Sequence, residues 1–126
     1  MRLLLDTHVV LWWLAGDRRL SAAARGAIVG GGEILVSAAS VWEMAIKAGL
    51  GRLELPKDLG GFLSEQLRVN GFEVLPVGLR HAAVRDLPRH HPDPFDRLLV
   101  AQARVEGAAL VTQDAKLRAY EVACVG

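Results

Sequence analysis

Residues 2–7 read Arg-Leu-Leu-Leu-Asp-Thr, a short aliphatic run that stops at an acidic residue. Such a run is typical of a buried β-strand, and it leaves Asp6 at the carboxyl end of that strand. Further apolar runs follow at residues 34–36, 72–76 and 108–111, with a weaker one at 122–124. Each is short and has glycine or polar residues beside it, so we interpret all of them as strands.

Helix signals occupy the segments between these strands. Ser21 and Asp93 are predicted to cap two helices, and Pro94 after Asp93 is favoured at a first helical position. Ser-Val-Trp-Glu at residues 40–43 matches a capping box, which predicts a helix start at Ser40. Apolar strands that alternate with helices predict a parallel sheet covered on both faces, an α/β sandwich. The predicted helices cover residues 9–15, 21–28, 40–48, 58–69, 79–87 and 94–106.

The composition excludes several classes of protein. The chain has 126 residues, and its 52% of hydrophobic residues excludes intrinsic disorder. A net charge of +1 argues against a globally basic nucleic-acid-binding surface, and the single Cys124 cannot form an internal disulfide or a zinc site. No apolar run reaches the roughly 18 residues of a membrane span, and the first run meets Asp6 too soon for a signal peptide. We expect one cytoplasmic domain over residues 1–126, whose apolar surplus indicates an oligomer or a bound partner.

Four acidic residues are predicted to meet at one edge of the sheet. Asp6 and Asp114 follow the first and fourth strands, and Glu43 and Asp96 lie in the first turns of helices. Ligands of parallel α/β sheets bind outside the carboxyl ends of the strands. Carboxylates that share one crevice stay ionised together only when a cation neutralises them, and an all-oxygen donor set selects Mg²⁺ or Mn²⁺. Such a metal suggests hydrolysis of a phosphodiester.

Each acid also has a purely structural interpretation. Glu43 fits the capping box and forms an i,i+4 pair with Lys47, Asp96 suits any helix N-terminus, and Asp114 could cap the last helical turn. A phosphoacceptor or binding module on a similar sheet is a further alternative. The adjacent His90 and His91 lie in a Pro-rich loop and are interpreted as solvated surface residues. The three tryptophans are interpreted as core or interface residues: Trp12, Trp13 and Trp42.

Four motifs in this order resemble those of PIN domains. Leu-Leu-Asp-Thr-His at residues 4–8 looks like the opening of the family. Val-Ser-Ala-Ala-Ser-Val-Trp-Glu-Met-Ala-Ile-Lys at 36–47, continued at 49–56, resembles the central motif of VapC-type PIN toxins. Asp-Pro-Phe-Asp-Arg-Leu-Leu-Val-Ala-Gln-Ala at 93–103 is similar to the third motif. Leu-Val-Thr-Gln-Asp at 110–114 is similar to the fourth, with Gln113 where the family often has Asn.

The resemblance implies a single PIN domain, a three-layer α/β/α sandwich with a parallel sheet of about five strands. It implies a Mg²⁺- or Mn²⁺-dependent endoribonuclease, the toxin of a toxin–antitoxin pair, with Asp6 and Asp96 most directly tied to the metal and Glu43 and Asp114 completing the quartet. A homodimer and a VapB-type antitoxin whose tail covers the site are implied as well, with DNA bound only through the antitoxin. A PIN nuclease that processes RNA without being a toxin remains the alternative. The residues expected to assist near the site or on the RNA are Thr7, Thr112, Arg97 and Lys47.

Overall fold

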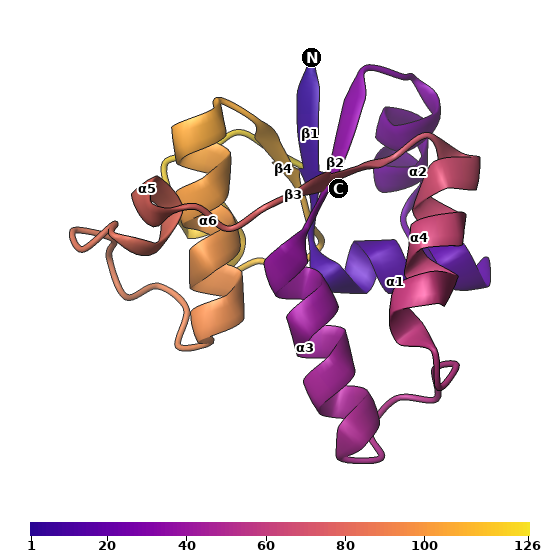
Figure 1. Cartoon of the computed structure of the whole chain (residues 1–126). Coiled ribbons are helices and arrows are strands. Elements are labelled where there is room, and N and C mark those ends of the chain that lie inside the picture. Colours follow the sequence, from indigo (N-terminus) through magenta and orange to yellow (C-terminus); the bar gives the residue numbers. More distant parts are fainter.

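The first strand, β1 (Arg2–Leu5), lies at the centre of an all-parallel sheet in the computed structural model, which describes residues 1–126. The sheet has five strands in the order β3-β2-β1-β4-β5 (Figure 1). This confirms the predicted α/β architecture with a parallel sheet. The other strands are β2 (Glu33–Ser37), β3 (Glu73–Leu75), β4 (Ala109–Val111) and β5 (Cys124–Val125).

Helices cover both faces of the sheet because successive side chains of a strand point to opposite faces. Leu4 pairs in register with Leu35 and Leu110, and these three pack with Leu99 and Val100 on one side. The flanking positions of the same strands face the other side, where they pack with four helices: α1 (Thr7–Ala15), α2 (Ala22–Val29), α3 (Ala38–Gly49) and α4 (Leu59–Asn70). Figure 1 shows this division, with α5 and α6 to the left of the sheet and α1, α2 and α4 to the right. The inner strands β2, β1 and β4 are therefore buried on both faces, as is typical of parallel sheets.

The helices follow their expected start and stop signals. Ser21 caps α2 by accepting a hydrogen bond from the Ala24 N–H, and Asp93 caps α6 by accepting from the Phe95 and Asp96 N–H groups. Gly107 ends α6 in the left-handed conformation, at φ 64°. None of the helices is long and apolar enough to span a bilayer. The helices are α1 (Thr7–Ala15), α2 (Ala22–Val29), α3 (Ala38–Gly49), α4 (Leu59–Asn70), α5 (Leu79–Ala82), α6 (Pro94–Glu106) and the 3₁₀ turn η1 (Leu117–Ala119).

Two predicted helices differ from the structure. The capping box at residues 40–43 is wrong, because α3 begins at Ala38 and its N-cap is Ser37, whose hydroxyl accepts from the Ala39 N–H. The strand β2 runs directly into α3, so the hydroxyl of Ser37, the last residue of the strand, accepts a free N–H group of the first helical turn. Glu43 is thereby released from any capping role. The helix predicted over residues 79–87 is a single turn, α5, followed by an irregular segment up to Asp93.

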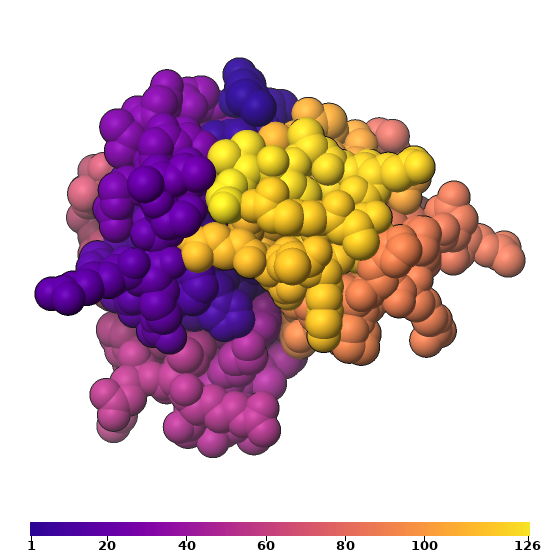
Figure 2. Space-filling model, turned by 180° about the vertical axis from the view of Figure 1, so that it is seen from behind, coloured from indigo at the N-terminus to yellow at the C-terminus, as the bar shows by residue number.

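The strand order places a topological switch beside β1. The chain moves outward from β1 to β2 and β3, then crosses to β4 and β5 on the other side of β1. Ligand crevices of open α/β sheets lie outside the carboxyl ends of the strands at such a point. Figure 2 shows the opposite side of the molecule, where the C-terminal residues (yellow) lie between the N-terminal third (indigo to violet) and the segment in orange. A ligand-binding crevice is thus expected at the carboxyl ends of β1 and β4.

Candidate active site

Asp6 lies at the switch point, directly after β1. Its backbone N–H donates to the Val111 carbonyl (2.9 Å), and its Oδ2 accepts from the Thr112 hydroxyl (2.8 Å), so β1 and β4 jointly orient the carboxylate. Only 4% of Asp6 is exposed, and its other oxygen, Oδ1, is buried without a hydrogen-bond partner. Burial raises the pKa of this carboxyl above its ordinary value. A buried carboxylate oxygen left unpaired is costly, so Oδ1 needs a ligand that the protein itself does not supply.

Glu43 reaches the same region from α3, which extends beyond the carboxyl edge of the sheet (Figure 1). Its Oε1 accepts from the Thr7 hydroxyl (2.9 Å), and its Oε2 lies 2.6 Å from the Lys47 Nζ. Thr7 Oγ1 is also 2.8 Å from Ser40 Oγ. A hydroxyl has one proton and a carboxylate only accepts, so Thr7 donates to Glu43 and Ser40 donates to Thr7. Because α3 begins at Ala38, Ser40 and Glu43 do not cap it. They form a buried hydrogen-bond network with Thr7 instead.

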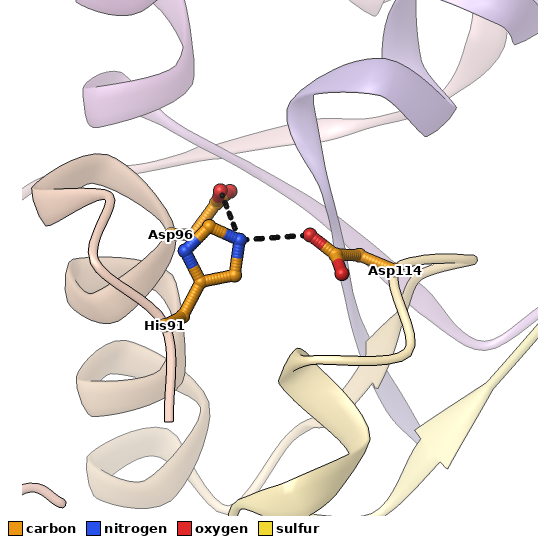
Figure 3. Close-up of side chains that lie close together, drawn as sticks. All are labelled: His91, Asp96 and Asp114. Carbon is orange, nitrogen blue, oxygen red and sulfur yellow. Dashed lines mark hydrogen bonds and ion pairs between the residues drawn. The ribbon is translucent and has the colours of Figure 1, made fainter. Parts of the chain in front are cut away.

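Asp96 and Asp114 approach each other from α6 and from the loop after β4, with His91 between them (Figure 3). The His91 Nε2 lies 2.8 Å from the Asp114 Oδ2 and 3.3 Å from the Asp96 Oδ2. Asp96 sits in the first turn of α6, where the Asp93 cap holds its backbone. His91 is itself buried, which contradicts its interpretation as a solvated surface residue.

The acids share one electrostatic environment. Burial, followed by the charge of Asp6, raises the pKa of Asp96 to about 7, and the charge of Glu43 acts in the same direction. Glu43 also raises the pKa of Asp6. The pKa of Asp114 is lowered instead: partial burial raises it, but hydrogen bonds from the Lys116 backbone and from His91 outweigh the burial. The carboxyls of Asp6, Glu43 and Asp96 thus repel one another, and a bound cation would relieve that repulsion.

A divalent cation fits these residues. Mg²⁺ and Mn²⁺ prefer carboxylate oxygens, and the site offers the unpaired Oδ1 of Asp6 together with the carboxylates of Asp96 and Asp114. A cavity of about 180 Å³ lies beside them, lined by Asp6, His8, Trp12, Gln113 and Asp114. The rings of His8 and Trp12 in this lining are tilted by 38° to each other, with centroids 5.6 Å apart. The donor set and the cavity beside it therefore leave room for an ion and for part of a substrate.

The residues expected to assist the acids have different surroundings. Thr7 and Thr112 are buried and hold Glu43 and Asp6, respectively, through their hydroxyls. Lys47 forms an ion pair with Glu43. The Arg97 guanidinium donates to the Leu87 and Pro88 carbonyls and so braces the irregular segment before α6. The structure therefore brings Thr7, Thr112 and Lys47 to the acids, while Arg97 points to the loop.

His91 and Ser40 are the site residues that sequence reasoning missed. Ser40 was assigned to a helix cap that the structure does not form. A signal for His91 does exist in His-Pro-Asp-Pro at residues 91–94. The residue before a proline favours extended backbone, and from such a backbone the ring of His91 can turn back toward the helix cap. The Asp93 N–H indeed donates to the His91 Nδ1 (3.0 Å).

Replacing Thr112 with Val should destabilise the protein. The change removes the hydroxyl that donates to Asp6 and accepts from the Asp114 N–H (3.1 Å), while the shape of the side chain is kept. The buried Asp6 carboxylate and the partly buried Asp114 N–H then lack partners, and we expect the free energy of unfolding to fall by about 1–3 kcal/mol. Urea denaturation measures this, with Thr112→Ser as the control that keeps the hydroxyl. Equal stability of the Val and Ser variants would contradict the assigned role of the hydroxyl.

The metal-free protein should become less stable as the pH rises from about 4 to about 7. Unfolded Asp96 ionises near its ordinary pKa of about 4, whereas in the folded state its pKa is about 7. The native state therefore binds the proton more tightly through this window, and the free energy of unfolding falls with rising pH. Asp96→Asn should remove this contribution and be more stable than the wild type at pH 8 in EDTA.

Chemical denaturation at a series of pH values checks this expectation. The exposed Asp86 offers a matched control, because Asp86→Asn removes a carboxyl outside the cluster. The difference in stability between wild type and Asp96→Asn should grow between pH 4 and pH 7, and the difference for Asp86→Asn should not. A constant difference for Asp96→Asn would show that this carboxyl is not shifted.

Comparison with known proteins agrees with this geometry. A family model described as "PIN domain" matches residues 3–123. Ribonuclease VapC22 of Mycobacterium tuberculosis is 39% identical over 121 residues, which cover 93% of this chain and 90% of that protein. The match to the family model spans the positions of all four acids of the site.

Solved structures share the fold at lower identity. The structure of VapBC2 from Rickettsia felis, bound to a DNA fragment from their promoter, has a chain that is 13% identical with a TM-score of 0.68, covering 98% of this chain and 97% of that chain. FitAcB from Neisseria gonorrhoeae gives 20% identity and a TM-score of 0.64, with 97% and 95% covered. At these identities the likeness concerns the arrangement of the sheet and helices.

Proposed function

The chain belongs to the PIN-domain family, and from that membership we propose that it is a divalent-metal-dependent endoribonuclease, the toxin of a VapBC-type toxin–antitoxin pair. One observation of the site carries the chemistry: a buried, unpaired oxygen of Asp6 lies among further carboxylates at the switch point of the sheet. A relative named as a ribonuclease, alike over nearly its whole length, supports RNA as the substrate.

Asp6 and Asp96 are the residues that would hold the ion, with Glu43 and Asp114 completing its surroundings. A bound Mg²⁺ or Mn²⁺ supplies the acidity that makes water a nucleophile near neutral pH, and it neutralises the charge of the phosphodiester. Thr112 and Thr7 keep the carboxylates of Asp6 and Glu43 in fixed orientations through their hydroxyls. This preorganisation lowers the cost of binding both the ion and the scissile phosphate.

The RNA would enter beside His8 and Trp12, next to the acids. Arg19 lies over the Trp12 ring, with its guanidinium carbon 5.4 Å from the ring centroid, and its backbone carbonyl accepts from the Gln113 amide (2.8 Å). Arg19 is exposed and paired with Asp17 (2.8 Å), so a phosphate would compete with that carboxylate for its guanidinium. The rings of His8 and Trp12 are the proposed surfaces for a base. Arg18 and Lys116 are further exposed cations whose contact with RNA we propose.

A VapB-type antitoxin and a second copy of this chain are the proposed protein partners. Several large apolar side chains are exposed, among them Trp42 (62%) and Leu50 (65%) on α3 and at its end. A mostly apolar groove of about 420 Å³ runs between α1, the segment 53–56 and α4. Exposed apolar surface of this kind favours protein association. The proposed place of action is the cytoplasm, where RNA and an antitoxin would both be present.

Cleavage of a structured RNA pool by the purified protein tests the nuclease. We expect cutting with Mn²⁺ or Mg²⁺ and none with EDTA, and we expect RNA cutting to be lost when a purified antitoxin is added. A protein that neither cuts RNA nor binds Mn²⁺ would contradict the proposal. Induced expression in a bacterial host then separates toxin from processing enzyme, because only a toxin should arrest growth in a way that co-expressed antitoxin relieves.

A further inference from the structure

Two hydrogen bonds that do not involve the acids hold His91 in place. Its Nδ1 accepts the Asp93 N–H (3.0 Å), and its own backbone N–H donates to the Tyr120 hydroxyl (3.0 Å). Only 8% of the residue is exposed. The Asp93 carboxylate at the same time caps α6, so the ring, the cap and the helix start form one rigid unit. The loop therefore orients His91 independently of the acids that its Nε2 contacts.

This anchoring decides which ring nitrogen carries the proton. A nitrogen that accepts an N–H must present a lone pair, so the proton of the neutral imidazole lies on Nε2. The Nε2–H then donates to the Asp114 Oδ2 at 2.8 Å and lies 3.3 Å from the Asp96 Oδ2 (Figure 3). A metal ligand would need a lone pair on that same nitrogen. The hydrogen bond from Asp93 thus disfavours His91 as a ligand, although it sits among the acids.

We propose that His91 is a positioning residue, which holds the carboxylates of Asp96 and Asp114 together for the metal without binding the metal itself. This rests on the proposed metal-dependent function. The two acids come from separate elements, α6 and the loop after β4, and their charges repel. Because Nδ1 is occupied by the Asp93 N–H, the ring presents its Nε2–H to the acids, and this donor offsets that repulsion. The Asp114 Oδ2 takes the hydrogen bond from His91, while its Oδ1 accepts from the Lys116 N–H (2.9 Å). The Asp96 Oδ2 lies 3.3 Å from the same Nε2.

His91→Asn tests this role while sparing the loop. The Asn side-chain oxygen can accept the Asp93 N–H in place of Nδ1, as in an Asx turn, but the side chain is too short to reach both acids. The exposed neighbour His90, which packs on the edge of Tyr120, gives the matched control His90→Asn. Mn²⁺ affinity is measured by calorimetry, thermal stability without metal serves as the folding check, and RNA cleavage is followed in parallel.

We expect His91→Asn to bind Mn²⁺ about 10- to 100-fold more weakly than the wild type, the range typical when a group that holds a metal ligand is removed. His90→Asn should bind as the wild type does. Nitrogen-15 NMR of the imidazole should show the Nε2–H tautomer for His91, both without metal and with saturating Mg²⁺. Unchanged or tighter Mn²⁺ binding by a folded His91→Asn would overturn the proposal, as would a lone pair on Nε2 with Mg²⁺ bound.

The failure of this proposal is distinguishable from the failure of the nuclease. A wild-type protein that binds Mn²⁺ and cuts RNA, together with a His91→Asn variant that does both equally well, refutes only the role of His91. A wild-type protein that binds no Mn²⁺ and cuts no RNA refutes the metal-dependent function, and the role of His91 falls with it.

Discussion

We expect the substitution Asp6→Asn to abolish RNA cleavage and at the same time to make the metal-free protein more stable, the largest effect of any single substitution proposed. The unpaired Oδ1 of Asp6 is the strongest reason to place a cation here, and an amide nitrogen in its place cannot bind one. We expect the cleavage rate to fall on the order of a hundredfold to a thousandfold or more, since removing one preorganised electrostatic group costs about that much in comparable sites.

The gain in stability follows from burial of the same group. The Asp6 carboxyl is buried next to other acids, and its raised pKa reports that the charged form is disfavoured in the folded state. Asn keeps an oxygen that can accept from Thr112 and removes the charge. Active sites commonly carry such a cost in stability for the sake of function. The midpoint of thermal unfolding in EDTA at pH 8 should therefore rise by a few degrees.

Three measurements separate this expectation from simple misfolding. Circular dichroism should show an unchanged spectrum for Asp6→Asn, and calorimetry should show that Mn²⁺ binding is lost. The control Asp86→Asn, an exposed acid outside the cluster, should cleave RNA and bind Mn²⁺ as the wild type does. Retained cleavage by Asp6→Asn at the wild-type rate would refute the assigned chemistry of the site.

Divalent metal should stabilise the wild-type protein strongly. A ligand that binds only the folded state raises the free energy of unfolding by about 2.7 kcal/mol at 100 times its Kd. For a chain of this length, that corresponds to a rise in the thermal midpoint on the order of 10 °C. The physical cause is relief of the repulsion within the cluster, where the charges of Asp6 and Glu43 raise the pKa of Asp96.

The stabilisation by metal should also depend on pH. The pKa of Asp96 is about 7, so below pH 7 the ion has to displace a proton and binds more weakly. Thermal melts with Mg²⁺ or Mn²⁺ at pH 6 and pH 8 should show the larger shift at pH 8. Asp96→Asn should show little shift at either pH. An equal shift in wild type and Asp96→Asn would mean that the ion binds outside this cluster.

Local sequence features, the apolar runs and the helix caps, predicted much of the fold. Short aliphatic runs ending at Asp6 and Thr112 predicted β1 and β4, and Ser21 and Asp93 cap the helices they were expected to cap. These features depend on neighbours a few residues away, which the sequence displays directly. The role of Glu43 was harder to predict, because both Ser37 and Ser40 are suitable N-caps for α3. The length of β2 decides between them, since the strand ends at Ser37.

The sequence by itself determined the alternation of strands and helices, and with it the position of four acids near strand or helix ends. Only the tertiary structure decided that β4 lies beside β1, which brings Thr112 to Asp6 across 106 positions of the chain. It also decided that His91 is buried between Asp96 and Asp114, where a solvated loop was expected. The reason is physical: periodicity and capping are local, whereas strand order and burial depend on how the whole chain packs.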